Sequence, residues 1–224
     1  IVKDFRRALG LGILKDMFHI VAINLYGEVI ATETIELPYE NSDAYYSALT
    51  HNVEQFIQNH LYLPEKIEGI SIATQGIISP DGTTVTYGDI MENTQMKLSD
   101  FASRLPYSCH LEHDSKAAAD LELWNHPQFD SALIFLLNPN LGGAIITDHK
   151  VHQGNHMHSG LFEHICIDPN GPECYCGHHG CLETYCSANA LKAAAGMPVK
   201  EFFNILHTTQ APTLLQIWKR YLDH

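Results

Sequence analysis

Long apolar runs and basic residues are both scarce in this sequence. No apolar stretch reaches the roughly 18 residues that a membrane-spanning helix needs, so we expect no membrane partner. Lysine and arginine number 13 against 26 aspartates and glutamates, which gives a net charge of −13. A surface of that sign repels phosphate backbones, so we expect no nucleic acid to bind this chain directly.

The start of the chain lacks two further features. Residues 1–10 contain neither the apolar core and small-residue cleavage site of a signal peptide nor an initiator methionine. We therefore expect a cytoplasmic protein, and a sequence that is part of a longer chain. With 45% hydrophobic and 17% charged residues, the 224 positions are enough for one large or two small globular domains.

Predicted strands and helices alternate along the chain, as in an α/β protein. The strands are predicted at residues 8–14, 18–24, 29–37, 67–74, 107–113, 131–137 and 142–148. Tight turns join the first three, which should be antiparallel neighbours. The helices are predicted at residues 41–60, 97–105, 114–126, 188–195, 199–206 and 212–222. We expect two α/β lobes, residues 1–115 and 116–224.

The segment CYCGHHGC, residues 174–181, holds three of the 6 cysteines. One residue separates Cys174 from Cys176, four more precede Cys181, and glycines within the segment let the backbone turn sharply. Zinc takes four nitrogen or sulfur ligands in a tetrahedron, so a fourth ligand is needed. His164, ten residues before Cys174, is the predicted one.

Alternatives to this ligand set stay open. His178 and His179 lie inside the loop, although so tight a loop would be strained in turning either of them inward. A disulfide or free thiols are the other alternative, but a Cys-x-Cys pair bridges poorly with itself and nothing marks the chain as secreted. Three thiolates and one imidazole close the metal shell and leave no position for a water, so the predicted zinc is structural.

The same region resembles the signature of the ROK family, which includes bacterial sugar kinases and sugar-responsive transcriptional repressors. The family pattern is G-x5-G-E-x-G-H, followed ten residues on by C-x-C-G-x2-G-C-x-E. The matching residues here are Gly154, Gly160, His164, Cys174, Cys176, Gly177, Gly180, Cys181 and Glu183.

Two further segments follow the family in order. The stretch LEHDSKAAA, residues 111–119, is similar to the family block E-N-D-A-N-A-A-A, whose catalytic aspartate matches Asp114. The stretch GIISPDGTTV, residues 76–85, fits a glycine-rich strand and Asp-Gly turn. The resemblance implies an actin-like (ribonuclease H-like) fold with a sugar cleft between two lobes and a zinc-binding loop at 154–183. Family chains run further than His224, which implies a shortened second lobe.

Kinases of this family have a first phosphate loop that reads D-x-G-G-T, in which the aspartate helps to hold magnesium. The matching segment here is GILKD, residues 12–16. Gly12 replaces the aspartate, Leu14 and Lys15 replace the glycine pair, and Asp16 replaces the threonine. A carboxylate at that place would repel the γ-phosphate.

The second phosphate loop of the family reads G-T-G-I-G-G-G, and residues 138–144, NPNLGGA, match it. Gly142 and Gly143 are retained, but Pro139 replaces the threonine and removes an N–H donor. Because both phosphate loops have lost their donors, the resemblance predicts no kinase chemistry here and at most a vestigial base at Asp114.

The family's sugar site partly survives. Its five sugar-contacting positions correspond to His113, Asp114, Leu161, His164 and Glu183, and only Asp114, His164 and Glu183 keep the family residue. We predict that these three and His113 bind the sugar. Two plainer roles stay open, because Asp114 also suits a helix cap and Glu183 suits a first helical turn.

Two functions fit these observations. The first is a non-catalytic sugar-sensing effector and dimerisation domain of a transcriptional regulator, with DNA bound only by a domain before residue 1. Homodimers or higher homo-oligomers would match palindromic operators. The alternative is an ATP-dependent, glucokinase-like sugar kinase with unusual phosphate loops. The loss of phosphate donors favours the first.

Overall fold

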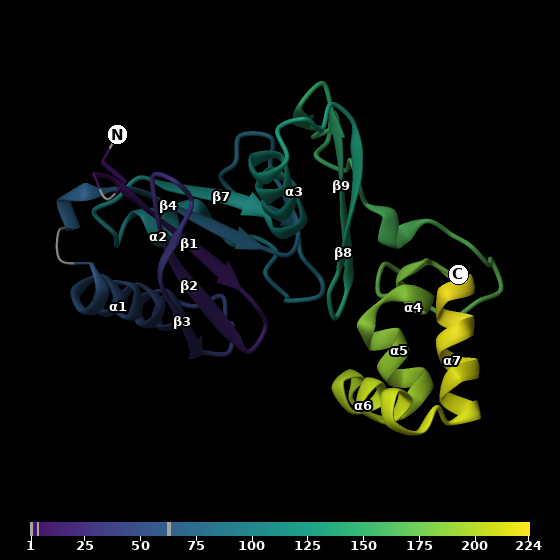
Figure 1. Cartoon of the computed structure of the whole chain (residues 1–224). Coiled ribbons are helices and arrows are strands. Elements are labelled where there is room, and N and C mark those ends of the chain that lie inside the picture. The colour runs from purple at the N-terminus through teal and green to yellow at the C-terminus, as the bar shows by residue number, and fades with distance from the viewer. Residues whose placement is uncertain (1, 4, 62–63) are drawn as a thin grey trace. The chain divides into compact units, whose positions relative to one another are not determined.

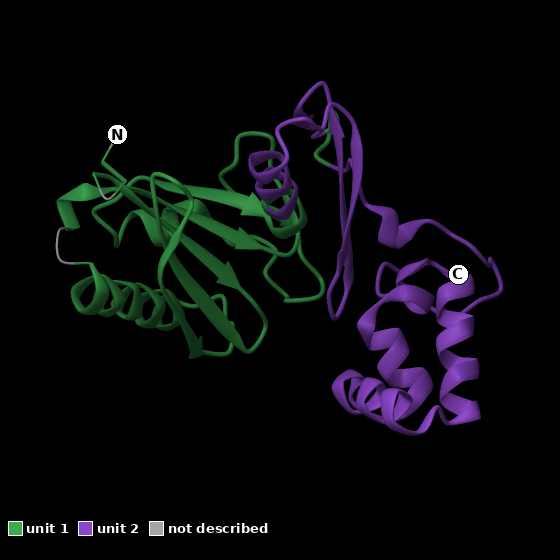
Figure 2. Ribbon diagram, in the orientation of Figure 1, with its two compact units in different colours: residues 1–117, 154–157 green, residues 118–153, 158–224 purple. Residues whose placement is uncertain are grey.

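A computed structural model describes residues 2–3, 5–61 and 64–224 of the chain (Figure 1). It forms two compact units: unit 1 comprises residues 1–117 and 154–157, and unit 2 comprises residues 118–153 and 158–224 (Figure 2). The assignment of lobes to residues 1–115 and 116–224 stays a prediction. No helix in the described ranges combines the length and apolar character that crossing a bilayer requires.

Unit 1 is built on a five-stranded sheet in the order β3-β2-β1-β4-β7. The strands are β1 Arg7–Ile13, β2 Met17–Asn24, β3 Val29–Glu36, β4 Ile67–Thr74 and β7 Cys109–His113. β1 pairs with β2 and β2 with β3 in antiparallel register, which confirms the prediction for the first three strands. β4 and β7 extend the sheet in parallel register, so their carboxyl ends share one edge.

Helix α1, Asp43–His60, covers this sheet with one apolar face. Ser42 starts the helix, because its side-chain oxygen accepts a hydrogen bond from the backbone N–H of Tyr45 at 3.2 Å. Leu49, Val53 and Phe56 are fully buried in the core of unit 1. Burying one such side chain stabilises the fold by about 1.5–3 kcal/mol. The smaller elements are η1 Pro64–Lys66, β5 Ile77–Ile78, β6 Val85–Tyr87 and α2 Leu98–Ala102.

Helix α3, Asp114–Asn125, begins directly after β7 and passes from unit 1 into unit 2. In unit 2 its Ala119 is fully buried against Ala144 and Ile146 of a three-stranded sheet in the order β10-β9-β8. The strands are β8 Ala132–Leu137, β9 Leu141–Thr147 and β10 Lys150–Val151. Small side chains on both partners allow helix and sheet to pack closely.

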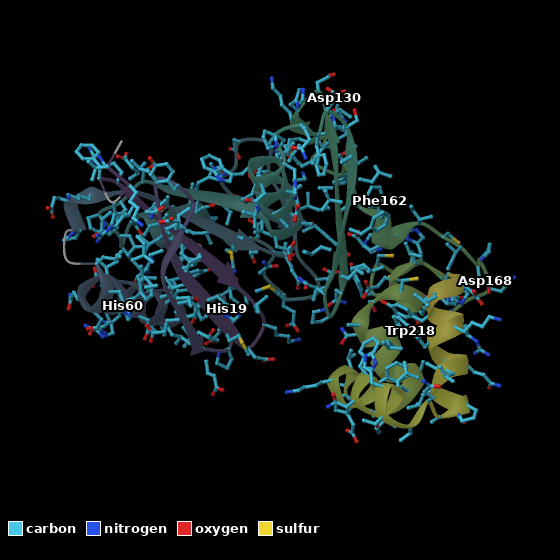
Figure 3. The ribbon with its side chains drawn as sticks, in the orientation of Figure 1. His19, His60, Asp130, Phe162, Asp168 and Trp218 are labelled. Carbon is cyan, nitrogen blue, oxygen red and sulfur yellow. The ribbon has the colours of Figure 1, made fainter. Side chains whose placement is uncertain are left out.

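The rest of unit 2 is mainly helical. Its elements are η2 Phe162–His164, α4 Glu183–Cys186, α5 Ala188–Ala195, α6 Val199–Thr209 and α7 Pro212–Asp223. Leu191, Phe202, Leu206 and Leu214 form the buried core of the last three helices. Trp218 of α7 completes it, with its ring centroid 5.1 Å from that of Phe203 (Figure 3).

Candidate functional site

The four predicted metal ligands lie together in unit 2. One ligand atom from each of His164, Cys174, Cys176 and Cys181 falls within 4.8 Å of all the others. His164 ends the short helix η2, and the three cysteines belong to the loop that leads into α4. Cys174 and Cys181 are buried, while His164 and Cys176 are partly exposed. Four donors of this kind at one point can hold a metal ion.

The distances between the donor atoms suit a tetrahedral ion. Bonds of about 2.3 Å from zinc to sulfur place two sulfur ligands about 3.8 Å apart. The Sγ atoms of Cys176 and Cys181 are 3.7 Å apart, and Cys174 Sγ lies 3.8 Å from Nδ1 of His164. All six cysteines are free thiols in this structure, so the disulfide alternative finds no support. The nature of the ion stays a prediction.

Two glycines shape the metal loop. Gly177 and Gly180 adopt φ angles of 81° and 67°, in the left-handed region that favours glycine. A Cβ on Gly180 would fall 1.6 Å from the carbonyl oxygen of Asp168, so the backbone itself packs there. The loop therefore requires glycine at position 180 for its close approach as well as for its turn.

Both rival histidines are exposed, and His178 contacts one of the four donors. Nδ1 of His178 lies 3.5 Å from Sγ of Cys176, and the ring sits at the exposed side of the loop. Nδ1 of His179 lies 3.1 Å from the carbonyl oxygen of Gly171. Neither histidine belongs to the group of four donors, so within the described residues His164 is the histidine that completes it.

Burial shifts the pKa of two of these donors, whereas hydrogen bonds lower the pKa of Cys176 against the effect of burial. Burial raises the pKa of the Cys174 thiol to about 12, and it lowers the pKa of His164. Without a cation the site therefore favours a neutral thiol at Cys174 and a neutral imidazole at His164. A bound cation reverses the preference of the thiol, because metal coordination deprotonates cysteine.

His113 and Asp114 lie in unit 1, where β7 meets α3. Nδ1 of His113 lies 2.8 Å from the hydroxyl of Ser115 and 3.4 Å from Oδ1 of Asp114. The same carboxylate oxygen accepts the backbone N–H of the next residue, Ser115, at 2.7 Å, whereas a helix cap would accept from the N–H two or three residues on. Burial raises the pKa of Asp114 and lowers that of His113, so both groups shift toward their neutral forms.

Lys116 is a buried charge that the sequence analysis missed. Only 4% of its surface is exposed, and its Nζ donates a hydrogen bond to the backbone carbonyl of Met157 at 3.0 Å. Burial lowers its pKa, while Glu112 opposes that shift. The sequence did contain a signal for this residue, because Lys116 replaces the second asparagine of the E-N-D-A-N-A-A-A block. Lys116 fixes the short segment 154–157 onto unit 1.

Glu183 lies in unit 2, two residues after Cys181, and is only 5% exposed. Its Oε1 accepts the side-chain amide of Asn140 at 2.7 Å, and its Oε2 accepts the backbone N–H of Leu141 at 2.7 Å. Burial raises its pKa, and these two hydrogen bonds together with one from the side chain of Ser187 oppose that rise. Asn140 is a second residue missed from the sequence, since nothing in its local pattern indicates a partner 43 positions away.

Both segments that match phosphate loops are bonded within the protein. In the first, the N–H of Leu14 donates to the carbonyl of Met17 at 2.9 Å. The carbonyls of Lys15 and Asp16 accept from the N–H groups of Tyr39 and Leu37 at 2.8 and 3.2 Å. This segment is a tight β-turn between β1 and β2, tied to the chain that follows β3.

The retained glycine of the second segment has a packing role. A Cβ on Gly143 would fall 2.4 Å from the ring of Phe162 and 2.5 Å from the carbonyl oxygen of Gly160. Phe162 also stacks on Phe135 of β8, with ring centroids 4.7 Å apart (Figure 3). Gly143 therefore lets the chain leading to the metal loop lie directly on β9.

Comparison with known proteins identifies the family and the fold. The ROK family matches residues 8–223. The N-acetylglucosamine repressor of Escherichia coli O157:H7 is 26% identical over 186 residues, which cover 82% of this chain and 46% of the repressor. The N-acetylmannosamine kinase of Vibrio vulnificus strain CMCP6 is 30% identical over 162 residues, which cover 67% of this chain and 55% of the kinase. The chain thus spans about half the length of these relatives.

A solved structure shows the same fold. It is a ROK family glucokinase from Streptomyces griseus in complex with glucose and AMPPNP, with a TM-score of 0.81 and 21% identity. The match covers 96% of this chain and 75% of the glucokinase. The fold is the mixed α/β, actin-like fold of sugar kinases and their related regulators, as predicted. The chain belongs to the ROK family.

Proposed function

We propose that this chain is the sugar-sensing effector and dimerisation domain of a ROK-type transcriptional regulator and that it has no kinase activity. The observation that carries this proposal is the internal bonding of both segments that match phosphate loops. Carbonyls of Lys15 and Asp16 are directed to the protein's own N–H groups, and Pro139 has no N–H to offer. A phosphate-binding loop needs the opposite arrangement, with free N–H groups directed at the ligand.

Both classes occur among the relatives. The repressor from Escherichia coli favours the sensor, and the N-acetylmannosamine kinase from Vibrio vulnificus favours a sugar kinase. The kinase alternative rests on family membership and on Asp114, the position that matches the catalytic aspartate. It requires phosphate contacts other than those of the family's two loops, whose key residues this chain has replaced.

We assign structural zinc to the four donors. His164, Cys174, Cys176 and Cys181 would hold the ion, and the chemistry of three thiolates and one imidazole suits zinc. Zinc in such a closed set supplies folding free energy and no catalysis. The loop between His164 and Cys181 carries little buried apolar surface of its own, which is the condition under which a metal becomes necessary.

The partners follow from the same proposal. A sugar or sugar derivative would contact His113, Asp114, His164 and Glu183. Two-fold homodimers would present paired DNA-binding domains to palindromic operators, and that DNA contact would belong to a domain before residue 1. Such a regulator works in the cytoplasm, where the six free thiols also fit.

A thermal-shift panel tests the proposal directly. The panel contains hexoses, N-acetylhexosamines, pentoses and the phosphates of each, with ATP as a separate sample. A ligand that binds only the native state raises the melting midpoint. At a free ligand concentration of about a hundred times Kd, it adds about 2.7 kcal/mol to the free energy of unfolding. We expect a sugar or sugar phosphate to raise it and ATP to leave it unchanged. A shift with ATP and none with any sugar would contradict the sensor.

Asp114→Ala should weaken binding of the sugar found in that panel by about 1.5–3 kcal/mol, because a hydrogen bond to a buried charged group is lost. Isothermal titration calorimetry measures the change. Asp223→Ala is the matched control, since it removes an exposed carboxylate at the end of α7. Equal affinities for both variants would exclude Asp114 from the sugar site.

The 224-residue chain should not bind duplex DNA at physiological salt. Its net charge of −13 opposes contact with phosphates. An acidic surface neutralises few phosphates, so it releases few counterions from DNA and gains little binding free energy. An electrophoretic mobility shift with operator-length duplexes measures this. Tight, salt-sensitive binding of duplex DNA by this chain alone would show that the DNA-binding surface lies within the two described units.

A further inference from the structure

The turn between β8 and β9, residues 138–140, is held by hydrogen bonds on both of its sides. One set involves its backbone carbonyls, and the other involves the side chain of Asn140 and the N–H of Leu141. All of these groups belong to unit 2. The turn is thus hydrogen-bonded to the rest of unit 2, although Asn138 and Pro139 are exposed.

The carbonyls of the turn cap helix α5. The first N–H groups of a helix have no partner within the helix and must find one elsewhere. Here the N–H of Ala188 donates to the carbonyl of Asn138 at 3.2 Å, and that of Asn189 donates to the carbonyl of Pro139 at 3.1 Å. The hydroxyl of Ser187 accepts the third, from Ala190, at 3.0 Å. No free N–H is left among these three for an anion.

Glu183 holds the other side of the turn. Its two oxygens take separate donors, Asn140 Nδ2 and Leu141 N, each at 2.7 Å. A buried carboxylate with one donor on each oxygen is strongly restrained, because charge-assisted hydrogen bonds are short and directional. Glu183 also stands two residues after Cys181 and four before Ser187, so it lies between the metal loop and the start of α5.

We propose that Glu183 is a positioning residue that holds the β8–β9 turn on the amino end of α5. In this arrangement the protein's own carbonyls close a helix end that would otherwise attract an anion. The negative charge of Glu183 at the base of the turn opposes an anion there as well. The metal loop, the turn and the helices α5 to α7 then behave as one connected body.

This role does not depend on which ligand the chain binds. An ionised carboxylate has about four lone-pair sites, and the donors from Asn140, Leu141 and Ser187 leave one of them open. A sugar contact by Glu183, as proposed above, would therefore add to the positioning role. The experiment measures the turn itself, and sugar affinity is not one of its readouts.

The test exchanges donors and acceptors across the contact between Glu183 and Asn140. Asn140→Asp places a second carboxylate against Glu183 and should release the turn. Glu183→Gln alone should be mild, because a glutamine oxygen can accept from Leu141 N–H while its amide donates to a flipped Asn140. In the double variant the glutamine amide can donate to the carboxylate introduced at position 140, which should restore the contact.

Amide hydrogen exchange on the whole 224-residue chain reports the result at Leu141, Ala188 and Asn189. We expect Asn140→Asp to speed exchange at these amides by about tenfold or more, and the double variant to return to within about threefold of wild type. Asn204→Asp, at an exposed position of α6, is the control for added charge and should leave them unchanged.

Two results would overturn the proposal. One is unchanged exchange at Leu141, Ala188 and Asn189 in Asn140→Asp. The other is a double variant that exchanges as fast as Asn140→Asp alone, since that shows no specific pairing with position 183. If Asn140→Asp does not fold, Asn140→Ala takes its place. Asn140→Ala should speed exchange at Leu141, while the amide of Ile20, in the core of unit 1, should stay protected. If the two amides respond alike, the proposal is wrong.

Discussion

Cys181→Ser should remove the bound metal and lower the melting midpoint by about 10 °C or more. Cys181 is one of the four donors and is fully buried, and its Sγ lies 3.7 Å from that of Cys176. Structural zinc contributes about 10–16 kcal/mol in small zinc-finger peptides, and a domain of this size shifts by about 2–4 °C for each kcal/mol. Loss of even a third of that free energy gives the expected change.

Elemental analysis and scanning calorimetry measure this result. The wild-type chain should carry one zinc ion, and Cys181→Ser should carry little. Cys109→Ser is the matched control, because Cys109 is a partly buried thiol of unit 1 whose hydrogen bond to the carbonyl of Tyr107 a serine can replace. A wild-type protein purified without metal, or a disulfide at Cys174, would refute the zinc assignment.

No phosphoryl transfer from ATP to any common hexose, N-acetylhexosamine or pentose should be detectable above background. Kinases of this type act by positioning the γ-phosphate and neutralising its charge. In the first turn Gly12 stands where a metal-linked aspartate is needed, and Asp16 brings a negative charge. In the second, Pro139 has no N–H and its carbonyl is bonded to α5. General-base assistance by Asp114 is worth only about 10²–10⁴-fold.

A coupled ADP-release assay measures this, on the 224-residue chain and on any longer protein that contains it. A ROK glucokinase with glucose is the positive control, and Asp114→Ala should match the wild-type background. Steady turnover in the wild type that disappears in Asp114→Ala would show that the kinase alternative is right. It would also show that the phosphates are held by groups other than the two turns.

The regular elements and the clustering of the three cysteines were predictable because their signals are local. Ser42 before an apolar helical face predicts the start of α1, and the structure places its hydroxyl on the N–H of Tyr45. The ligand spacing of Cys174, Cys176 and Cys181 brings the sulfurs together through one tight turn. Strand and helix periodicity likewise depends on neighbouring residues, so the seven predicted strands were all found.

Short elements escaped prediction. β5, β6 and β10 have two or three residues each, too few for an alternating pattern to appear. Their pairing partners decide whether such segments become strands, and those partners are known only in the fold. The same holds for α4, a single turn that starts at Glu183.

Partnerships between distant residues were decided by tertiary structure alone. The choice of His164 over the nearer His178 depends on how η2 returns to the cysteine loop. Glu183 reads from its sequence as a sugar ligand or a first-turn acid, yet its described partners are Asn140 and Leu141. Lys116 became a buried tether only because Met157 is folded onto unit 1. Local spacing sets which turns a chain can make, whereas the pairing of buried polar groups depends on which backbones the packing brings together.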